Sequence, residues 1–244
     1  MSWSHLSGAT ETPIGSHMMD VNKSLEFWRD NFWGKNLSPW HVNWTHPVLI
    51  KYQHYLLVNE RPGRILVPLC GKSVDLKYLY EQGHEVFGVE CVSEAIEKFF
   101  QENNFQFDII SIDGHRAYQT PDKRLSILNV NFFDVKGPTL NNSFDAVWDR
   151  AALVAVRAEH RTLYAESIKR LVKDNFRYLL ATVEYEQEKM RGPPFSVFEH
   201  DVVNLYSSWA AITKLESYKI NSGKFVAAGV DICETVYFLN VKAL

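Results

Sequence analysis

RILVPLCGKSVDLKYLYEQGHEVFGVE (Arg64–Glu90) is the stretch of sequence that decides the fold. Its first segment, Arg64–Leu69, is apolar and typical of a buried strand. Residues Ser73–Gln82 follow with apolar side chains at helical spacing, and Gly83 ends that helix. A second apolar strand is predicted at Glu85–Glu90. Strand, helix and strand in such close succession predict an open α/β sheet with parallel strands.

The sequence after this stretch extends the pattern and then interrupts it. Ser93 is a favoured N-cap residue and predicts a helix over Glu94–Asn103. The Asp113-Gly114 pair that comes next is a strong hairpin signal. Three strand-like segments surround it in direct succession, namely Phe107–Ile112, Arg116–Gln119 and Leu125–Phe133. We therefore expect a small β insertion near residues 105–125.

The two ends of the chain complete the predicted fold. Helical spacing of apolar residues from Val21 and a favoured helix start at Pro47 predict an N-terminal helical cover. Later elements are expected at Phe144–Trp148 (strand), Glu159–Val172 (helix), Tyr178–Val183 (strand), Glu199–Ser208 (helix), Ile212–Ile220 and Val230–Leu239 (both strands). The last two are expected to form an antiparallel pair after a parallel core. The prediction is a mostly parallel α/β sheet with helices on both faces.

Length and composition limit the class of protein. The chain has 244 residues, of which 46% are hydrophobic and 23% charged. This globular composition excludes a disordered chain, a collagen-like repeat and a coiled coil, and no apolar run approaches the length of a membrane span. We predict a flexible segment over residues 1–20, where Gly15-Ser16-His17-Met18 is typical of an expression-vector remnant, and a single domain over 21–244.

The net charge and the cysteine content limit the kinds of partner and the cellular compartment that we expect. The net charge is −3, from 26 basic and 29 acidic residues, so we expect a small-molecule partner rather than nucleic acid or a membrane. The three cysteines are too few for a disulfide framework and lack the CxxC spacing of a zinc site. We therefore predict a cytoplasmic protein. His41, His46 and His54 are expected in surface or capping roles, and no metal is expected.

Candidate ligand-binding residues follow the first two strands, because open α/β sheets bind ligands outside the carboxyl ends of their strands. Gly71 lies in the first strand-to-helix turn, but a single glycine there makes neither a dinucleotide fingerprint nor a phosphate loop. Glu90 ends the second strand 19 residues later, where an acidic side chain commonly binds the ribose hydroxyls of an adenine nucleoside. An ordinary turn and a helix-capping glutamate remain open on these residues.

Two further strand ends offer candidates. Asn131 and Phe132 lie at the carboxyl end of the third core strand, where a polar group and an aromatic ring suit an adenine, and a core aromatic next to a turn is the alternative. Asp149 and Arg150 follow the fourth, either as polar groups turned into a cleft or as a structural ion pair. The N-terminal region adds a dense aromatic set that suits either a lid over a flat heterocycle or sulfonium, or simple helix packing: Trp28, Phe32, Trp33, Trp40 and Trp44.

Taken together, these segments resemble the thiopurine S-methyltransferase family, a branch of the S-adenosylmethionine-dependent methyltransferases with a seven-stranded Rossmann-like sheet. Four stretches support the resemblance: LVPLCGKSVDL (Leu66–Leu76), GHEVFGVECVSEAIEKFF (Gly83–Phe100), FDAVWDRAALVAV (Phe144–Val156) and GPPFSV (Gly192–Val197). Weaker matches extend the similarity from about Leu25 to Leu239. The resemblance implies a single methyltransferase domain over 21–244, expected to act as a monomer.

The resemblance also assigns roles by position. It implies that the donor, S-adenosylmethionine, contacts Trp28, Phe32, Trp40, Leu69, Gly71, Glu90, Asn131, Phe132 and Arg150. In this assignment Glu90 binds the ribose hydroxyls, and Arg150 lies near both donor and acceptor as the catalytic residue. The implied acceptor site comprises Trp40, Arg150, Pro194, Phe195 and Lys224.

The chain departs from the family pattern mostly around the acceptor. Phe32 stands where a second Trp is common, Trp40 where Phe is common, Ala151 where Gly is commoner, and Lys224 about where some members have an acceptor-binding Arg. The function implied is direct SN2 methyl transfer to the sulfur of a small aromatic or heterocyclic thiol. The alternatives are a halide or thiocyanate methyltransferase and a non-catalytic adenine-nucleoside-binding protein of the same fold.

Overall fold

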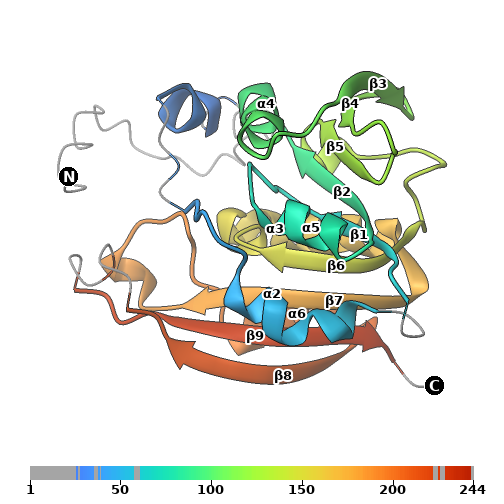
Figure 1. The fold of residues 1–244 in the computed structure, drawn as a ribbon. Helices are drawn as coiled ribbons and strands as arrows, with labels where there is room; N and C mark the ends of the chain where they lie inside the picture. The colour runs from blue at the N-terminus through green and yellow to red at the C-terminus, as the bar shows by residue number, and fades with distance from the viewer. Residues whose placement is uncertain are drawn as a thin grey trace.

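The protein is described as a computed structural model in which residues 26, 28–35, 38, 40–57, 61–221, 225 and 229–242 are placed. Their strands form one nine-stranded sheet in the order β3-β4-β5-β2-β1-β6-β7-β9-β8 (Figure 1). The strands are β1 (Arg64–Val67), β2 (Glu85–Glu90), β3 (Asp108–Ile112), β4 (His115–Gln119), β5 (Leu125–Asn129), β6 (Phe144–Arg150), β7 (Val172–Glu184), β8 (Ala210–Lys219) and β9 (Cys233–Val241).

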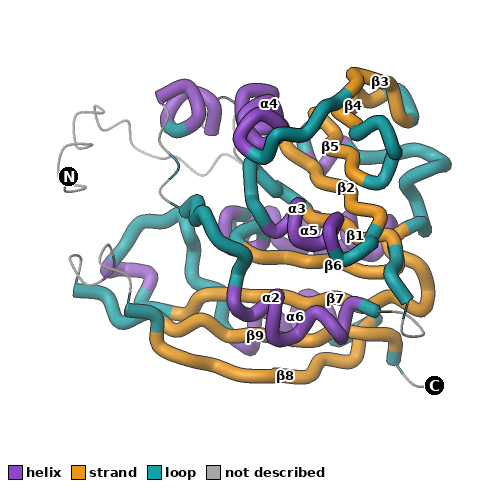
Figure 2. The backbone as a smooth tube through the Cα atoms, in the orientation of Figure 1, coloured by secondary structure: helices purple, strands orange, loops and turns teal. Residues whose placement is uncertain are grey.

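Helices cover both faces of this sheet (Figure 2). They are α2 (Pro47–Tyr52), α3 (Asp75–Glu81), α4 (Ser93–Glu102), α5 (Arg161–Leu171) and α6 (Glu199–Tyr206). One apolar core packs α2, α3 and α4 against the sheet through side chains such as Leu49, Leu76 and Phe99. A second core packs α5 and α6 against the other face through Tyr164 and Val202. We call these the α3 face and the α5 face.

The pairing confirms the predicted Rossmann-like architecture. Strands β5, β2, β1, β6 and β7 are parallel neighbours, whereas β9 and β8 run antiparallel at one edge. These seven strands are the expected core. The hairpin of β3 and β4 adds two more on the other edge, where β4 pairs antiparallel with β5. Its turn residues Asp113 and Gly114 have φ of 50° and 85°, as the Asp-Gly signal predicts.

Several predicted element boundaries are wrong, for local reasons. The third core strand ends at Asn129 instead of Phe133, because Phe132 enters a short 3₁₀ helix, η4 (Phe132–Asp134). Ser93 is the first residue of α4 rather than its N-cap, and Val92 precedes it. Strand β6 continues two residues beyond the predicted end, to Arg150. None of the helices in the described part of the chain combines the length and apolarity of a bilayer crossing. The predicted segment 1–20 lies outside the described residues.

Candidate functional site

The carboxyl ends of the parallel strands meet at one edge of the sheet, and most of the predicted site residues gather there. Register pairs Val67 with Gly88, Glu90 with Asn129, and Arg150 with Ala181. The turn after β1, the end of β2, the residues after β5 and the end of β6 are therefore neighbours. This is the edge at which open α/β sheets bind ligands.

Glu90 is fixed in front of the glycine turn. Its Oε2 accepts a hydrogen bond from the backbone N–H of Gly71 at 3.0 Å, and its Oε1 accepts one from the N–H of Val92 at 2.8 Å. Burial raises the pKa of this carboxyl, and hydrogen bonds from Val92, Cys91 and Gly71 only partly oppose the rise. The Val92 contact is a helix-start interaction of the kind that the sequence left open. Each carboxylate oxygen can still accept a further hydrogen bond, so two vicinal hydroxyls remain suitable partners.

The turn after β1 has an unusual backbone. Leu69 and Gly71 adopt φ of 45° and 54°, in the left-handed region. A Cβ added to Gly71 would lie 3.1 Å from Cζ2 of Trp33, so the glycine also lets this indole approach the turn. Trp33 is 5% exposed and belongs to the aromatic set, yet the sequence assigned it no donor contact. Its closeness to Gly71 makes it an additional candidate for the site.

Four of the five N-terminal aromatic residues form one cluster over the start of α4. The ring of Trp40 lies 5.2 Å from that of Trp28, 4.9 Å from that of Phe32 and 5.8 Å from that of Trp33, between centroids. Trp33 packs with Val92 and Ala95 at the beginning of α4. Trp44, by contrast, is 61% exposed. The cluster is therefore both helix packing and a cover beside the glycine turn.

Asn131 and Phe132 follow β5 at this edge but serve the fold as well. Asn131 is buried, and its side chain accepts a hydrogen bond from the N–H of Phe133, which caps η4. The Phe132 ring is 3% exposed and lies 5.0 Å from the ring of Tyr164 on the α5 face. Phe132 is thus a core aromatic, as the alternative had it. A contact of either residue with adenine stays a prediction.

Arg150 and Asp149 point to opposite faces of β6, because successive side chains alternate along a strand. Asp149 is fully buried on the α5 face, where its carboxylate accepts hydrogen bonds from the hydroxyls of Tyr164 and Tyr178, both at 2.6 Å. Arg150 lies half-buried on the other face, and its Nη1 donates to the carbonyl oxygen of Trp40 at 3.3 Å. The predicted alternative of an Asp149–Arg150 ion pair is wrong. Arg150 instead ties the end of β6 to the aromatic cover.

The predicted acceptor loop at Pro194 and Phe195 contacts the segment that follows Arg150. The N–H of Phe195 donates to the carbonyl oxygen of Val154 at 2.6 Å, and the Tyr185 hydroxyl donates to the carbonyl oxygen of Pro194 at 2.5 Å. Val154 belongs to η5 (Leu153–Ala155), the short helix that follows β6. The structure thus brings this loop to the segment that follows Arg150. The remaining predicted acceptor residue, Lys224, lies outside the described residues.

Ala151 adopts a φ of 65°, at the position where the family pattern has glycine. A side chain in this region costs about 1 kcal/mol or more, offset in part by the backbone entropy that glycine adds to the unfolded chain. We expect Ala151→Gly to raise the free energy of unfolding by about 0.5–1 kcal/mol, measured by urea denaturation. Ala152→Gly is the control, because Ala152 has a φ of −90° and is fully buried, and it should destabilise the fold. Equal losses in both variants would contradict the strain argument.

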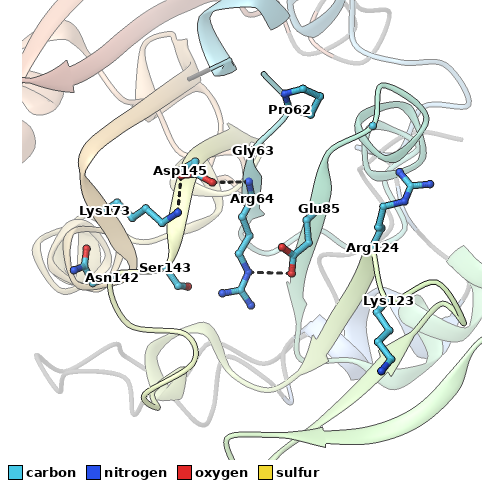
Figure 3. Close-up of a pocket in the computed structure, with 11 residues that line it drawn as sticks. Pro62, Gly63, Arg64, Glu85, Lys123, Arg124, Asn142, Ser143, Asp145 and Lys173 are labelled. Carbon is cyan, nitrogen blue, oxygen red and sulfur yellow. Dashed lines mark hydrogen bonds and ion pairs between the residues drawn. The ribbon is translucent and has the colours of Figure 1, made fainter. Parts of the chain in front are cut away.

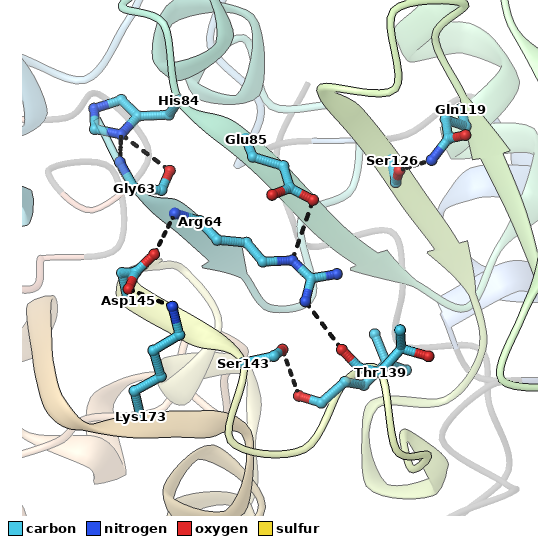
Figure 4. A network of polar contacts seen from close by, with 11 residues as sticks. Gly63, Arg64, His84, Glu85, Gln119, Ser126, Thr139, Ser143, Asp145 and Lys173 are labelled. Carbon is cyan, nitrogen blue, oxygen red and sulfur yellow. Dashed lines mark hydrogen bonds and ion pairs between the residues drawn. The ribbon is translucent and has the colours of Figure 1, made fainter. Parts of the chain in front are cut away.

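A separate charged cleft of about 830 Å³ lies at the opposite edge, at the amino ends of the strands (Figure 3). Its charges largely pair with one another (Figure 4). Arg64 Nε lies 3.2 Å from Glu85 Oε1, and Lys173 Nζ lies 2.7 Å from Asp145 Oδ1. The N–H of Arg64 also donates to Asp145 at 2.8 Å. These contacts tie β1, β2, β6 and β7 together, and none of them involves the predicted site residues.

Within the described ranges, no group of three or more His, Cys, Asp or Glu side chains is arranged to hold a metal ion. Cys70, Cys91 and Cys233 are free thiols. Among the described residues, those predicted for the site include the buried carboxylate of Glu90, the guanidinium of Arg150 and a cluster of aromatic rings.

Comparisons with known proteins identify relatives of this chain in sequence and in structure. The sequence model of the family described as thiopurine S-methyltransferase matches residues 23–242. The thiopurine S-methyltransferase of Bos taurus is 32% identical, with 97% of this chain and 98% of that protein covered, and the enzyme of Panthera tigris is 35% identical, with 90% of each covered.

Solved structures support the fold. The 1,6-didemethyltoxoflavin-N1-methyltransferase of Burkholderia thailandensis, solved with 1,6-didemethyltoxoflavin and S-adenosylhomocysteine, superposes with a TM-score of 0.62 at 16% identity and 95% coverage of each chain. The N-methyltransferase NodS of Bradyrhizobium japonicum, solved with S-adenosylhomocysteine, gives 0.55 at 12% identity, with 91% of this chain and 99% of that chain covered. Both likenesses confirm the predicted Rossmann-like sheet.

Proposed function

Because the chain belongs to the thiopurine S-methyltransferase family, whose members use S-adenosylmethionine, we propose that it methylates the sulfur of small aromatic or heterocyclic thiols. The observation that best supports this proposal is that Glu90 and Arg150 both lie at the carboxyl edge of the sheet. Glu90 holds its carboxylate 3.0 Å from the Gly71 N–H, and Arg150 ends the strand on the other side of β1. The carboxylate of Glu90 suits the ribose hydroxyls of a donor, and the guanidinium of Arg150 suits an anionic acceptor.

The residues present fit the donor. Two ribose hydroxyls can donate to the two oxygens of Glu90, and the left-handed turn at Leu69 and Gly71 exposes backbone for the methionine portion. Trp33 and Trp40 supply aromatic faces, which attract a sulfonium cation. When bound, S-adenosylmethionine supplies an electrophilic methyl group on a sulfonium sulfur, which a thiolate can take in one in-line displacement.

Methyl transfer to an aromatic thiol needs few catalytic groups from the protein. An acidic aromatic thiol is partly ionised near pH 7, so no strong general base is needed. Arg150 holds the thiolate by charge-assisted hydrogen bonds, directly or through water. Trp40 and the loop at Pro194 and Phe195 then exclude water and fix the approach of the sulfur. We include in this proposal a cytoplasmic location and a monomeric state.

The test combines donor binding with a comparison of acceptors. We expect micromolar binding of S-adenosylhomocysteine by titration calorimetry, with NAD as the control ligand, and transfer of labelled methyl from S-adenosylmethionine to thiophenol-type acceptors. Faster transfer to iodide or thiocyanate than to any aryl thiol would replace the proposal with a halide methyltransferase. Donor binding without transfer to any acceptor would indicate the non-catalytic binding protein. A folded chain that binds no S-adenosylhomocysteine would refute all three.

A further inference from the structure

A buried carboxylate, Glu234, shares a sheet face with Arg150. Register places Arg150 level with Ala181 of β7, and Ala181 level with Val236 of β9. Register partners point to the same face of a sheet, and Ala181 and Val236 both belong to the core of the α3 face. Glu234 precedes Val236 by two residues and therefore points to this face as well. On the intervening strand β7, Ala181 lies level with Arg150 and Val183 lies level with Glu234.

Glu234 is held as a carboxylate rather than left to solvent. It is 6% exposed, its Oε2 lies 3.4 Å from His46 Nε2, and its Oε1 accepts a hydrogen bond from the Tyr218 hydroxyl. Burial by itself raises the pKa of Glu234, but the contacts with His46 and Tyr218 and the charge of Arg150 outweigh burial and lower it. Glu234 therefore carries a negative charge at neutral pH.

His46 is the direct partner of Glu234, with its Nε2 3.4 Å from the carboxylate, and two other titratable groups on this side add no charge of their own. Tyr218 stays neutral, because burial and the carboxylate of Glu234 raise its pKa. His41, next to Trp40, is also neutral near pH 7, because burial lowers its pKa and the charge of Lys72 lowers it further. Lys72 is itself paired with Glu102 at 2.6 Å. The acceptor side thus combines the cation of Arg150 with the anion of Glu234.

We propose that Glu234 sets the charge preference of the acceptor site, so that it takes aromatic thiols that bring one negative charge and rejects those that carry a second. Arg150 accommodates the thiolate, and Glu234 repels a carboxylate placed elsewhere on the ring. This inference rests on the proposed function and names its substrate class: thiols whose ring bears no acid group. Glu234 acts here as a specificity residue, at a distance from the reacting atoms.

The experiment compares 4-mercaptobenzoate with its methyl ester, which differ in one carboxylate charge. We expect the wild type to prefer the ester, and Glu234→Gln to raise kcat/KM for the acid relative to the ester by about tenfold. Glu184→Gln is the matched control. Its carboxylate ends β7 at the same edge but bonds to Thr235 at 2.7 Å, on the α5 face. We expect it to change the ratio less than twofold. A general loss of structure would lower kcat/KM for both acceptors together and leave their ratio unchanged.

Binding measurements separate the inference from the proposed function. Calorimetry with the methylthio products of the two acceptors, in the presence of S-adenosylhomocysteine, reports the charge preference without turnover. If the preference appears in binding and Glu234→Gln removes it, while no thiol is methylated, the inference stands and the proposed function fails. If both acceptors are methylated and their ratio is the same in wild type and Glu234→Gln, the inference is wrong. Glu234→Met repeats the test should the Gln variant fail to fold.

Discussion

Glu90→Gln is expected to weaken S-adenosylhomocysteine binding by about 10²-fold, which corresponds to roughly 3 kcal/mol for two hydrogen bonds to a charged group. The substitution keeps the size of the side chain and removes the charge. Its amide can offer one oxygen as an acceptor, whereas the carboxylate already holds the N–H groups of Gly71 and Val92 and has capacity left for two hydroxyls. Titration calorimetry measures the loss directly. Glu94→Gln, four residues away and exposed, is the control and should bind like wild type.

The same carboxyl predicts a pH dependence with a definite sign. Burial raises the pKa of Glu90 above its ordinary value of 4.5, so protonation begins at a higher pH than for an exposed glutamate. The protonated form has lost the charge that the ribose hydroxyls would meet. Affinity for S-adenosylhomocysteine should therefore fall as the pH drops from 7.5 toward 5, as long as the chain stays folded. Glu90→Gln should show a flatter profile, and parallel profiles in both proteins would assign the titration to another group.

The pair of Gly71 and Glu90 could be predicted because both follow buried strands whose ends are unambiguous in the sequence. The apolar runs before them fix the two strands, and parallel neighbours bring their carboxyl ends together. The hairpin insertion could also be predicted from the sequence, because Asp113-Gly114 specifies its own turn geometry. Local chemistry and tertiary arrangement agree in these segments, so sequence reasoning succeeds there.

Other site features depended on details that periodicity does not supply. The predicted strand at Phe144–Trp148 ended two residues early, and only its continuation to Arg150 shows that Asp149 and Arg150 face opposite sides. Trp33 and Phe32 are adjacent aromatic residues, and tertiary packing alone decides which one lies against Gly71. Glu234 became a candidate only through the register of β7, β8 and β9, because its partner His46 lies far away in sequence and Tyr218 is brought beside it by the pairing of β8 with β9.

Arg150→Ala is expected to lower kcat/KM for an ionised aryl thiol by about 10²-fold, because it removes the cation that we propose holds the thiolate beside the methyl group. Arg150→Lys should recover part of the loss, since an ammonium keeps the charge but not the planar fork of donors. Arg170→Ala is the control: Arg170 is exposed, bonds to the side chain of Asn141, and should leave turnover unchanged. A wild-type rate in Arg150→Ala would remove Arg150 from the reaction.

Two readouts separate the role of Arg150 toward the acceptor from its tie to the cover. Its Nη1 bonds to the carbonyl oxygen of Trp40, so the Ala variant could lose activity merely because the aromatic cluster loosens around the donor. In that case S-adenosylhomocysteine affinity should fall as far as kcat/KM does. If Arg150 instead holds the acceptor, donor affinity changes by no more than a few-fold, and added guanidinium restores part of the thiol methylation rate. The second pattern is the one expected, because the hydrogen bonds of Glu90 to Gly71 and Val92, at the proposed donor site, do not involve β6.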